Sequence, residues 1–324
     1  MEYSADKPAA VCLMGPTASG KTDLALAMAQ RWPFEVISVD SALIYRDMNI
    51  GTAKPDADFL RRLPHHLVDI RNPDEAYSAA EFRKEALPIM EDITRRGNIP
   101  LLVGGTMLYF KILLEGIADM PSSTATIRAA ILDEAAQQGW PAMHAKLEQI
   151  DPLSAAKIHQ HHSQRISRAL EVYYAGGETL SSLQSRQQLQ RPPYNFLQLA
   201  LWPENRALLH RRIAQRFEHM LEQGFIDEVE GLRQRYALHS DMPSMRAVGY
   251  RQVWRFLDGE IDRDHLIEQG VAATRQLAKR QLTWLRKWPD LHQLPLGQDE
   301  NEAQDVSKRR VLSRIEGLMA GIRL

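Results

Sequence analysis

The most chemically suggestive segment is Gly15-Pro16-Thr17-Ala18-Ser19-Gly20-Lys21-Thr22, close to the N-terminus. It fits the P-loop pattern, in which glycines let backbone N–H groups surround a phosphate, the lysine adds charge and the last hydroxyl reaches Mg²⁺. A glycine-rich turn with an incidental lysine is the alternative. We predict that this segment binds phosphate, with Thr22 as the Mg²⁺ ligand. The pattern leaves open a kinase, an NTPase or transfer of a group attached to a pyrophosphate.

Two other predicted strands end in polar residues that could take part in such chemistry. Apolar and β-branched runs at 35–39 and 100–103 end at Asp40-Ser41 and at Gly104-Gly105-Thr106. The phosphate segment itself follows the apolar run 9–14 and precedes a helical pattern. By itself, an aspartate after a strand is more often a helix cap than a catalytic base. Because the carboxyl ends of parallel strands bind the ligand in such sheets, we expect the three polar ends to meet.

The order of these elements predicts an α/β fold. Strands alternating with helices are typical of a P-loop NTPase-like parallel sheet. We assign residues 1–115 to the first part of this core and 116–193 to a helical insertion domain. Residues 194–324 return to the core with one strand and continue as a helical, basic region.

The helices and the returning strand follow from hydrophobic spacing. Spacing near 3.6 residues predicts helices in each part of the chain, and β-branched alternation predicts the strand. The predicted helices are 78–95, 124–138, 154–174 and 204–222, then helical structure through Trp288 and a last amphipathic helix, and the returning strand is 195–201.

Composition excludes several classes of protein. The chain has 324 residues, of which 44% are hydrophobic, so it is neither disordered nor fibrous. With 40 Lys and Arg against 41 Asp and Glu, any nucleic-acid binding must depend on local patches. The single cysteine, Cys12, indicates a reducing compartment, and no segment is typical of a signal peptide or a membrane span. We expect a cytoplasmic protein that does not bind membranes.

Two segments combine positive charge with other features of nucleic-acid binding. Residues 271–288 hold five basic residues, no acidic residue and two tryptophans. Positive charge follows phosphates and aromatic rings stack on bases, although a solvated helix face with core tryptophans is the alternative. Residues 152–170 also lack acidic residues and contain His159, His161 and His162. No carboxylate or cysteine lies close to these histidines, which argues against zinc.

Further motifs follow the phosphate segment in one order. With that segment they resemble the bacterial tRNA dimethylallyltransferases, which place an isopentenyl group on an anticodon-loop adenosine. The resemblance covers about residues 9–288, and Leu43 departs from it because many members carry Gln there. The motifs are Asp40-Ser41-Ala42-Leu43-Ile44-Tyr45-Arg46, Gly51-Thr52-Ala53-Lys54-Pro55, Pro64-His65-His66-Leu67-Val68-Asp69, Gly104-Gly105-Thr106-Met107-Leu108-Tyr109, Gln164-Arg165-Ile166-Ser167-Arg168-Ala169-Leu170-Glu171, Arg212-Ile213 with Arg216-Phe217, Arg246-Ala247-Val248-Gly249-Tyr250-Arg251-Gln252 and Lys279-Arg280-Gln281-Leu282-Thr283-Trp284-Leu285-Arg286.

The resemblance implies a reaction and the residues that perform it. The P-loop would hold the diphosphate of dimethylallyl diphosphate with Mg²⁺, and the adenine N6 would attack the allylic carbon. Asp40 matches the general base, Thr106 the hydroxyl at the bridging oxygen, and Lys21 a catalytic cation. Arg212 would add to the diphosphate clamp. Taken alone, Thr106 could equally cap a helix and Arg212 could lie on a solvated face.

The resemblance also implies contacts with tRNA, whose target base must be flipped out of the anticodon loop. Besides Asp40 and Thr106, the implied contacts are Ser41, Ala42, Leu43, Arg128, Gln164, Arg165, Ile166, Ser167, Arg168, Arg246, Ala247, Val248, Gly249, Tyr250, Arg251, Lys279, Arg280, Gln281, Leu282, Thr283, Trp284, Leu285 and Arg286.

Three other functions compete with this interpretation. A nucleotide kinase shares the strand, P-loop and helix. An adenylate isopentenyltransferase would act on free AMP, and a non-catalytic RNA-binding protein would use the P-loop only structurally. We predict an Mg²⁺-dependent, monomeric tRNA dimethylallyltransferase that modifies adenosine 37.

Overall fold

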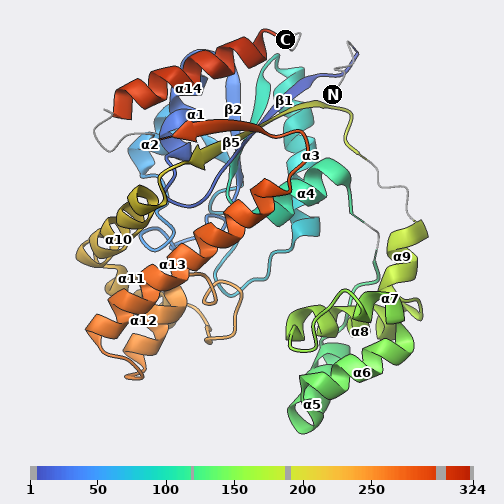
Figure 1. The fold of residues 1–324 in the computed structure, drawn as a ribbon. Helices are drawn as coiled ribbons and strands as arrows, with labels where there is room; N and C mark the ends of the chain where they lie inside the picture. The colour runs from blue at the N-terminus through green and yellow to red at the C-terminus, as the bar shows by residue number, and fades with distance from the viewer. Residues whose placement is uncertain (1–5, 118–119, 187–190, 297–303, 322–324) are drawn as a thin grey trace. The chain divides into compact units, whose positions relative to one another are not determined.

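The computed structural model describes residues 6–117, 120–186, 191–296 and 304–321 (Figure 1). The chain forms two compact units, one made of Met1–Leu114 and Pro192–Leu324 and the other of Glu115–Arg191. The first unit contains the sheet and the second contains only helices among its described residues. Within the described residues, no helix combines the length and the apolar character needed to cross a membrane.

The centre of the first unit is a six-stranded parallel sheet, which confirms the predicted P-loop-like α/β fold. The strand order is β3-β2-β4-β1-β5-β6, so the strand before the phosphate loop lies between the third predicted strand and the returning one. The strands are β1 (Ala9–Met14), β2 (Phe34–Val39), β3 (His65–His66), β4 (Ile99–Gly104), β5 (Asn195–Pro203) and β6 (His292–Leu296).

Strand register brings the three polar strand ends together, as expected. Met14 at the end of β1 pairs with Gly104 of β4, and Val39 at the end of β2 pairs with the same glycine. The phosphate loop, Asp40 and Gly105 therefore begin at one level along the sheet. Because β-strands alternate their side chains, Val11 and Leu13 enter one core and Cys12 the other. Burial of Cys12 raises the pKa of its thiol.

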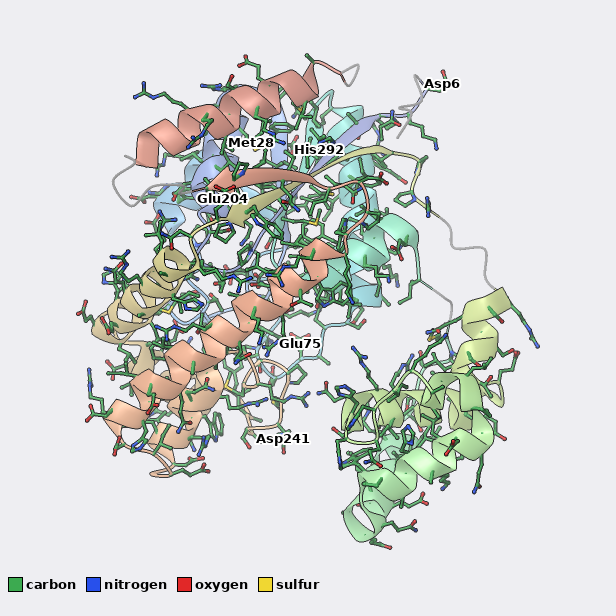
Figure 2. The ribbon with its side chains drawn as sticks, in the orientation of Figure 1. Asp6, Met28, Glu75, Glu204, Asp241 and His292 are labelled. Carbon is green, nitrogen blue, oxygen red and sulfur yellow. The ribbon has the colours of Figure 1, made fainter. Side chains whose placement is uncertain are left out.

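Helices cover both faces of the sheet (Figure 1). α1 (Lys21–Ala29) and α14 (Gln304–Met319) pack on one face, where Met28 of α1 lies fully buried among strand side chains (Figure 2). α3 (Ala79–Arg95) and α4 (Met107–Glu115) pack on the other face. α3 is the predicted helix at 78–95, and it begins with a capping box between Ser78 and Glu81.

A second helical layer in the first unit has its own core. Apolar side chains from α10, α11, α12 and α13 pack together with Ile44, Tyr45 and Met48, which follow β2. This packing places the helical region beside the carboxyl ends of the strands. The remaining helices of this unit are α2 (Ala57–Arg62), α10 (Arg206–Glu222), α11 (Phe225–Arg235), α12 (Tyr250–Leu257) and α13 (Arg263–Arg286).

The second unit is a small bundle of helices around a separate core that includes Ile131, Leu147 and Ile166. The predicted helix at 124–138 is present, and Thr124 caps it by accepting a hydrogen bond from the backbone of Ile127 at 3.2 Å. The helices are α5 (Ala125–Gln138), α6 (Trp140–Ile150), α7 (Pro152–Ala155), α8 (Ser163–Gly176) and α9 (Leu180–Arg186).

Two predictions of secondary structure are corrected, and one strand was not predicted. The helix predicted at 154–174 is broken between α7 and α8. There His144 Nε2 lies at hydrogen-bonding distance from the carbonyl oxygens of Ala155, at 3.1 Å, and Ile158, at 2.7 Å. Residues 236–249 are not helical. Pro243 in this segment has no N–H for a helical hydrogen bond. The side chain of buried Ser244 donates from Oγ to Pro73 O and fixes the segment to another part of the chain. β6 was not predicted, because a proline among only five residues argues against a strand. The strand forms nevertheless, since it lies at the edge of the sheet, where Pro295 is tolerated.

Candidate functional site

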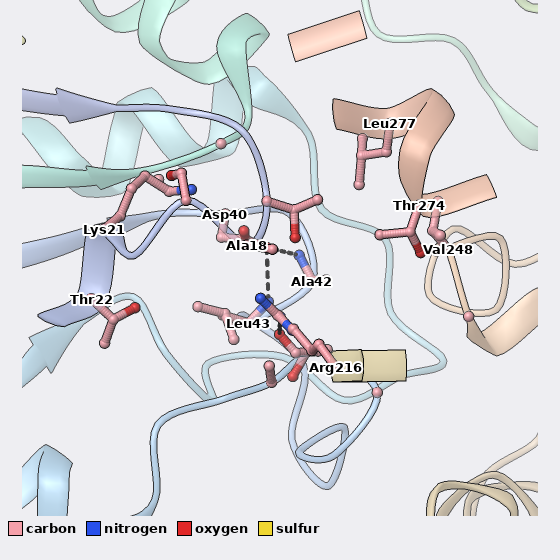
Figure 3. A pocket seen from close by; sticks show the side chains of 18 of the residues that line it. Ala18, Lys21, Thr22, Asp40, Ala42, Leu43, Arg216, Val248, Thr274 and Leu277 are labelled. Atoms are coloured by element: carbon pink, nitrogen blue, oxygen red, sulfur yellow. Dashed lines mark hydrogen bonds between the residues drawn. The ribbon is translucent and has the colours of Figure 1, made fainter. Parts of the chain in front are cut away.

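A pocket of about 330 Å³ lies at the carboxyl ends of β1, β2 and β4 (Figure 3). The phosphate loop contributes Thr17 through Thr22 to its lining, β2 is followed there by Asp40, and β4 ends there with Gly104 and Gly105. Polar residues from three separate strand ends thus face one space, which is the usual ligand site of an open parallel sheet.

The phosphate loop has the geometry of an anion site. Gly20 adopts φ 84°, a conformation that other residues rarely take, and stands at the N-cap of α1 without a side-chain cap. The first N–H groups of α1 are therefore left for a bound anion, which the helix dipole also favours. Gly15 and Pro16 do not line the pocket, and their carbonyls accept hydrogen bonds from Lys21 Nζ at 3.0 and 2.7 Å.

Lys21 and Arg216 supply two cations to this pocket. Burial lowers the pKa of Lys21 to about 8; Asp40 opposes that effect and Arg216 adds to it. Burial also lowers the pKa of Arg216, again opposed by Asp40. Both cations are therefore poorly solvated, and an anion that entered the pocket would relieve this cost.

The structure corrects the choice of arginine on α10. Arg212 does not line the pocket; it lies in a separate small depression beside Ser19 and Leu208. Arg216, one turn further along, lines the pocket and donates to Thr52 O at 3.4 Å. Helical spacing alone did not separate the two arginines, because residues four apart share one side of a helix. Each arginine is followed by a buried apolar residue, Ile213 or Phe217, so the neighbouring residues did not distinguish them either.

Asp40 is oriented by the turn that follows it. Its Oδ1 accepts hydrogen bonds from the backbone N–H of Ala42 at 2.8 Å and of Leu43 at 3.3 Å (Figure 3). Among the described residues, none donates to Asp40 Oδ2. One oxygen therefore holds the side chain in place while the other is left to accept a proton from a substrate, as a general base requires.

Thr106 lies at the edge of this arrangement, not in the pocket lining. Its Oγ1 accepts from the backbone N–H of Ser41 at 3.1 Å and lies 3.4 Å from Ser41 Oγ. Its own N–H donates to Val39 O at 3.2 Å. Thr106 thus connects the turn after β4 to the turn that carries Asp40.

The pocket lining also contains apolar side chains. They are Ile213, Phe217 and Met220 of α10, Leu277 of α13 and Leu43 after β2. The pocket therefore combines the phosphate loop with apolar surface. This combination suits an amphiphilic ligand in which a short apolar chain is joined to a diphosphate.

The residues present fit an Mg²⁺ ion that is bound mainly through a phosphate ligand. Thr22 lines the pocket at the first turn of α1, and the buried hydroxyls of Ser19 and Ser38 have no hydrogen-bond partner among the described residues. In the same residues no group of three His, Cys, Asp or Glu side chains could hold a metal. Mg²⁺ usually binds through few protein ligands together with substrate phosphates, so this donor set is suitable.

α13 divides the residues predicted there between two faces. The exposed face carries Thr283 and Trp284, the latter 39% exposed, together with Arg275, Lys279, Arg280, Arg286 and Lys287. The buried face carries Gln281, Leu282 and Leu285. Leu282 and Leu285 pack in the core, and Gln281 lines the pocket, so these three side chains lie away from the exposed basic face of α13.

α8 in the second unit shows the same division. Gln164, Arg165 and Arg168 are exposed, whereas Ile166 and Ser167 are buried, so the first three present their side chains at the surface of this helix. The buried carboxylate of Glu171 accepts from Ser167 Oγ at 3.0 Å. The same carboxylate pairs with Arg128 at 3.3 Å and with Arg168 at 3.8 Å, so it orients two of the predicted cations. The sequence motif contains Glu171 but did not indicate this role.

The segment before α12 is divided between pocket and surface. Ala247, Val248 and Gly249 line the pocket, and Arg246 and Arg251 are exposed. Tyr250 also lines the pocket; it is fully buried, and its hydroxyl donates to Glu228 at 2.6 Å.

Comparison with known proteins gives one consistent result. A family model described as IPP transferase matches residues 43–288. The tRNA dimethylallyltransferase 2 of Hahella chejuensis is 53% identical over 322 residues, covering 95% of this chain and 96% of that protein. The tRNA dimethylallyltransferase of Thiobacillus denitrificans is 58% identical over 297 residues, covering 92% and 95%.

Solved structures agree with these sequence relatives. The full-length tRNA isopentenylpyrophosphate transferase of Bacillus halodurans superposes with a TM-score of 0.69 at 33% identity, covering 97% of this chain and 98% of that one. A eukaryotic dimethylallyltransferase acting on tRNA superposes with a TM-score of 0.80 at 27% identity, covering 98% and 81%.

Proposed function

The chain belongs to the IPP transferase family, and we propose that it transfers a dimethylallyl group from dimethylallyl diphosphate to N6 of adenosine 37 in tRNA. Its membership confirms the resemblance seen in the sequence. The observation that carries the proposal is the pocket, which combines a phosphate loop, the carboxylate of Asp40 and apolar surface. Relatives at 53% and 58% identity are tRNA dimethylallyltransferases, which disfavours the nucleotide kinase.

In this proposal the phosphate loop and two cations hold the diphosphate. Lys21 and Arg216 face the phosphates, and the open N–H groups at the start of α1 complete the site. Thr22 would hold Mg²⁺, which when bound neutralises charge on the diphosphate. The chain's own cations also stabilise the charge that the leaving diphosphate gains in the transition state.

The transfer step assigns roles to Asp40 and Thr106. The allylic C–O bond breaks and its electron pair leaves with the diphosphate, while N6 of the adenine forms a bond to the allylic carbon. The N6 proton passes to the free oxygen of Asp40 as this bond forms. Thr106, held near Asp40 through Ser41, would donate to the bridging oxygen.

Exposed cations provide the surface for tRNA. In the first unit these are Arg246 and Arg251 with Lys279 and Arg280, and the second unit presents Arg165 and Arg168. Such groups bind phosphates without reading sequence, so they position the anticodon loop while the target base is turned outward. We propose that the protein works as a monomer on cytoplasmic tRNA.

One experiment tests donor, acceptor and product together. Unmodified tRNA is incubated with the protein, Mg²⁺ and dimethylallyl diphosphate, and its nucleosides are analysed by mass spectrometry. We expect the mass of one dimethylallyl group on adenosine 37 and release of one diphosphate. Parallel reactions with AMP as acceptor, and with ATP and nucleoside monophosphates, should give no product. Prenylated AMP or stoichiometric ADP would contradict the proposal and favour the corresponding alternative.

A further inference from the structure

Gln281 is a buried polar side chain that touches two parts of the site. It lies on the inner face of α13, is 9% exposed and lines the pocket. Its Oε1 accepts from the backbone N–H of Thr17 at 2.9 Å. Its Nε2 donates to Gly105 O at 3.0 Å. One amide thus joins the phosphate loop to the turn after β4.

These two bonds have consequences for the donor site. The N–H of Thr17 is used by Gln281, so this loop group does not face a phosphate. Gly105 immediately precedes Thr106, so the other bond holds the turn that carries the proposed hydroxyl donor. A Cβ on Gly105 would collide with Gln281 Nε2, which shows how closely the amide approaches this backbone.

We propose that Gln281 is a positioning residue, which sets the distance between the diphosphate-binding loop and Thr106. The inference rests on the proposed function, because it assigns both joined segments to the leaving diphosphate, the loop to its phosphates and Thr106 to its bridging oxygen. The two segments come from neighbouring strands, β1 and β4, but strand pairing ends at Met14 and Gly104. Beyond that point the amide of Gln281 supplies a direct connection between them.

The geometry distinguishes this role from contact with tRNA. Both polar atoms of the amide are already bonded to backbone groups, and the side chain is buried. One N–H and one lone pair of the amide remain, but the side chain is 9% exposed and lies on the inner face of the helix. The exposed neighbours Lys279 and Arg280 are available for RNA.

The first test replaces Gln281 by methionine, which has a similar length but cannot make either hydrogen bond. Gln276→Met is the matched control, since Gln276 is exposed on the same helix. We measure tRNA affinity, inorganic pyrophosphate affinity by calorimetry, and the single-turnover rate with both substrates saturating. For Gln281→Met we expect unchanged tRNA affinity, about 5-fold weaker pyrophosphate binding from the altered loop, and a rate lower by about 10²-fold from misplaced groups.

The second test breaks the same contact from its other partner. Gly105→Ala introduces the colliding Cβ, and the double variant with Gln281→Met should be no slower than the slower single variant, because both changes remove one connection. Additive losses in the double variant would overturn the inference. Weaker tRNA binding with a normal saturated rate in Gln281→Met would overturn it as well.

A failure of the proposed function would look different. The wild-type protein would then transfer no dimethylallyl group, although it is folded. In that case only the pyrophosphate affinities test the role of Gln281. Equal affinities in the wild type, Gln281→Met and Gln276→Met would refute its role at the loop.

Discussion

Removing the charge of Glu228 is expected to destabilise the segment 49–53, of which Gly51, Thr52 and Ala53 line the pocket. Glu228 lies on α11, and its Oε2 accepts from the backbone N–H groups of Asn49 at 2.9 Å and Ile50 at 2.6 Å. Its Oε1 accepts from Gly51 N at 3.1 Å and from the Tyr250 hydroxyl at 2.6 Å. One carboxylate therefore satisfies three consecutive backbone groups and one phenol.

The size of the effect follows from these four bonds. In Glu228→Gln the amide oxygen can keep the two bonds to Asn49 and Ile50, but as neutral bonds, which are weaker than bonds to a charged group. The amide NH₂ then replaces the oxygen that accepted from Gly51 N–H and from the Tyr250 hydroxyl. The Gly51 N–H is left without an acceptor, whereas the Tyr250 hydroxyl can rotate and accept from the new NH₂. Hydrogen bonds to charged groups contribute about 1.5–3 kcal/mol each. We therefore expect the free energy of unfolding to fall by about 3 kcal/mol.

Differential scanning calorimetry measures this loss directly. For a unit of roughly 250 residues, 1 kcal/mol corresponds to a shift of about 2–4 °C, so the Tm should fall by about 6–12 °C. Glu230→Gln is the control, because Glu230 is exposed on the same helix. A Tm of Glu228→Gln within ~2 °C of this control would refute the reasoning, since the carboxylate would then add little to the stability of the loop.

The other predictions concern chemistry and tRNA binding. Asp40→Asn keeps an acceptor for the turn, so tRNA affinity should persist while single-turnover transfer falls by about 10²–10⁴-fold; near-normal turnover would exclude Asp40 as the base. Because the pKa of Lys21 is lowered to about 8, its charge is lost as the pH rises through that value. Calorimetric pyrophosphate affinity should then fall about tenfold per pH unit in the wild type but not in Lys21→Arg, and parallel pH profiles would contradict this. Replacing Lys279 and Arg280 by Ala should reduce the slope of log K for tRNA binding against log salt concentration by about two, one for each counterion no longer released. An unchanged slope would show that this face of α13 is exposed to solvent without binding tRNA. Arg165→Ala should leave that slope nearly unchanged but lower the rate with saturating tRNA if it holds the flipped base, and an unaltered rate removes it from that step.

Local sequence was sufficient for the phosphate loop and for the meeting of the strand ends. The loop from Gly15 to Thr22 depends on glycine conformations and on residues adjacent in the chain, so its motif predicts its shape. The strands β1, β2 and β4 are short, apolar and flanked by turns, and parallel strands present the same end to one edge. The sequence pattern alone therefore places Asp40 and Thr106 at one edge of the sheet.

Helical periodicity alone did not separate the functions of neighbouring residues on α10 and α13. Arg212 and Arg216 are equivalent by spacing, and only the packing of α10 against residues 51–55 brings Arg216 into the pocket. The motif that contains Gln281 indicated a tRNA contact for every member, whereas the fold turns Lys279 and Arg280 outward and Gln281 inward.

What the sequence by itself determined is the set of chemical groups in this protein, namely a phosphate loop, a carboxylate and a hydroxyl at strand ends, and two basic segments, 152–170 and 271–288, without acidic residues. What only the tertiary structure decided is how these groups are held in place. Gln281 bonds to Thr17 across 264 positions of the chain, and Glu228 bonds to Asn49 across 179. Such partners are chosen by the packing of α11 and α13 against the sheet end, and no periodicity or motif within one segment carries that information.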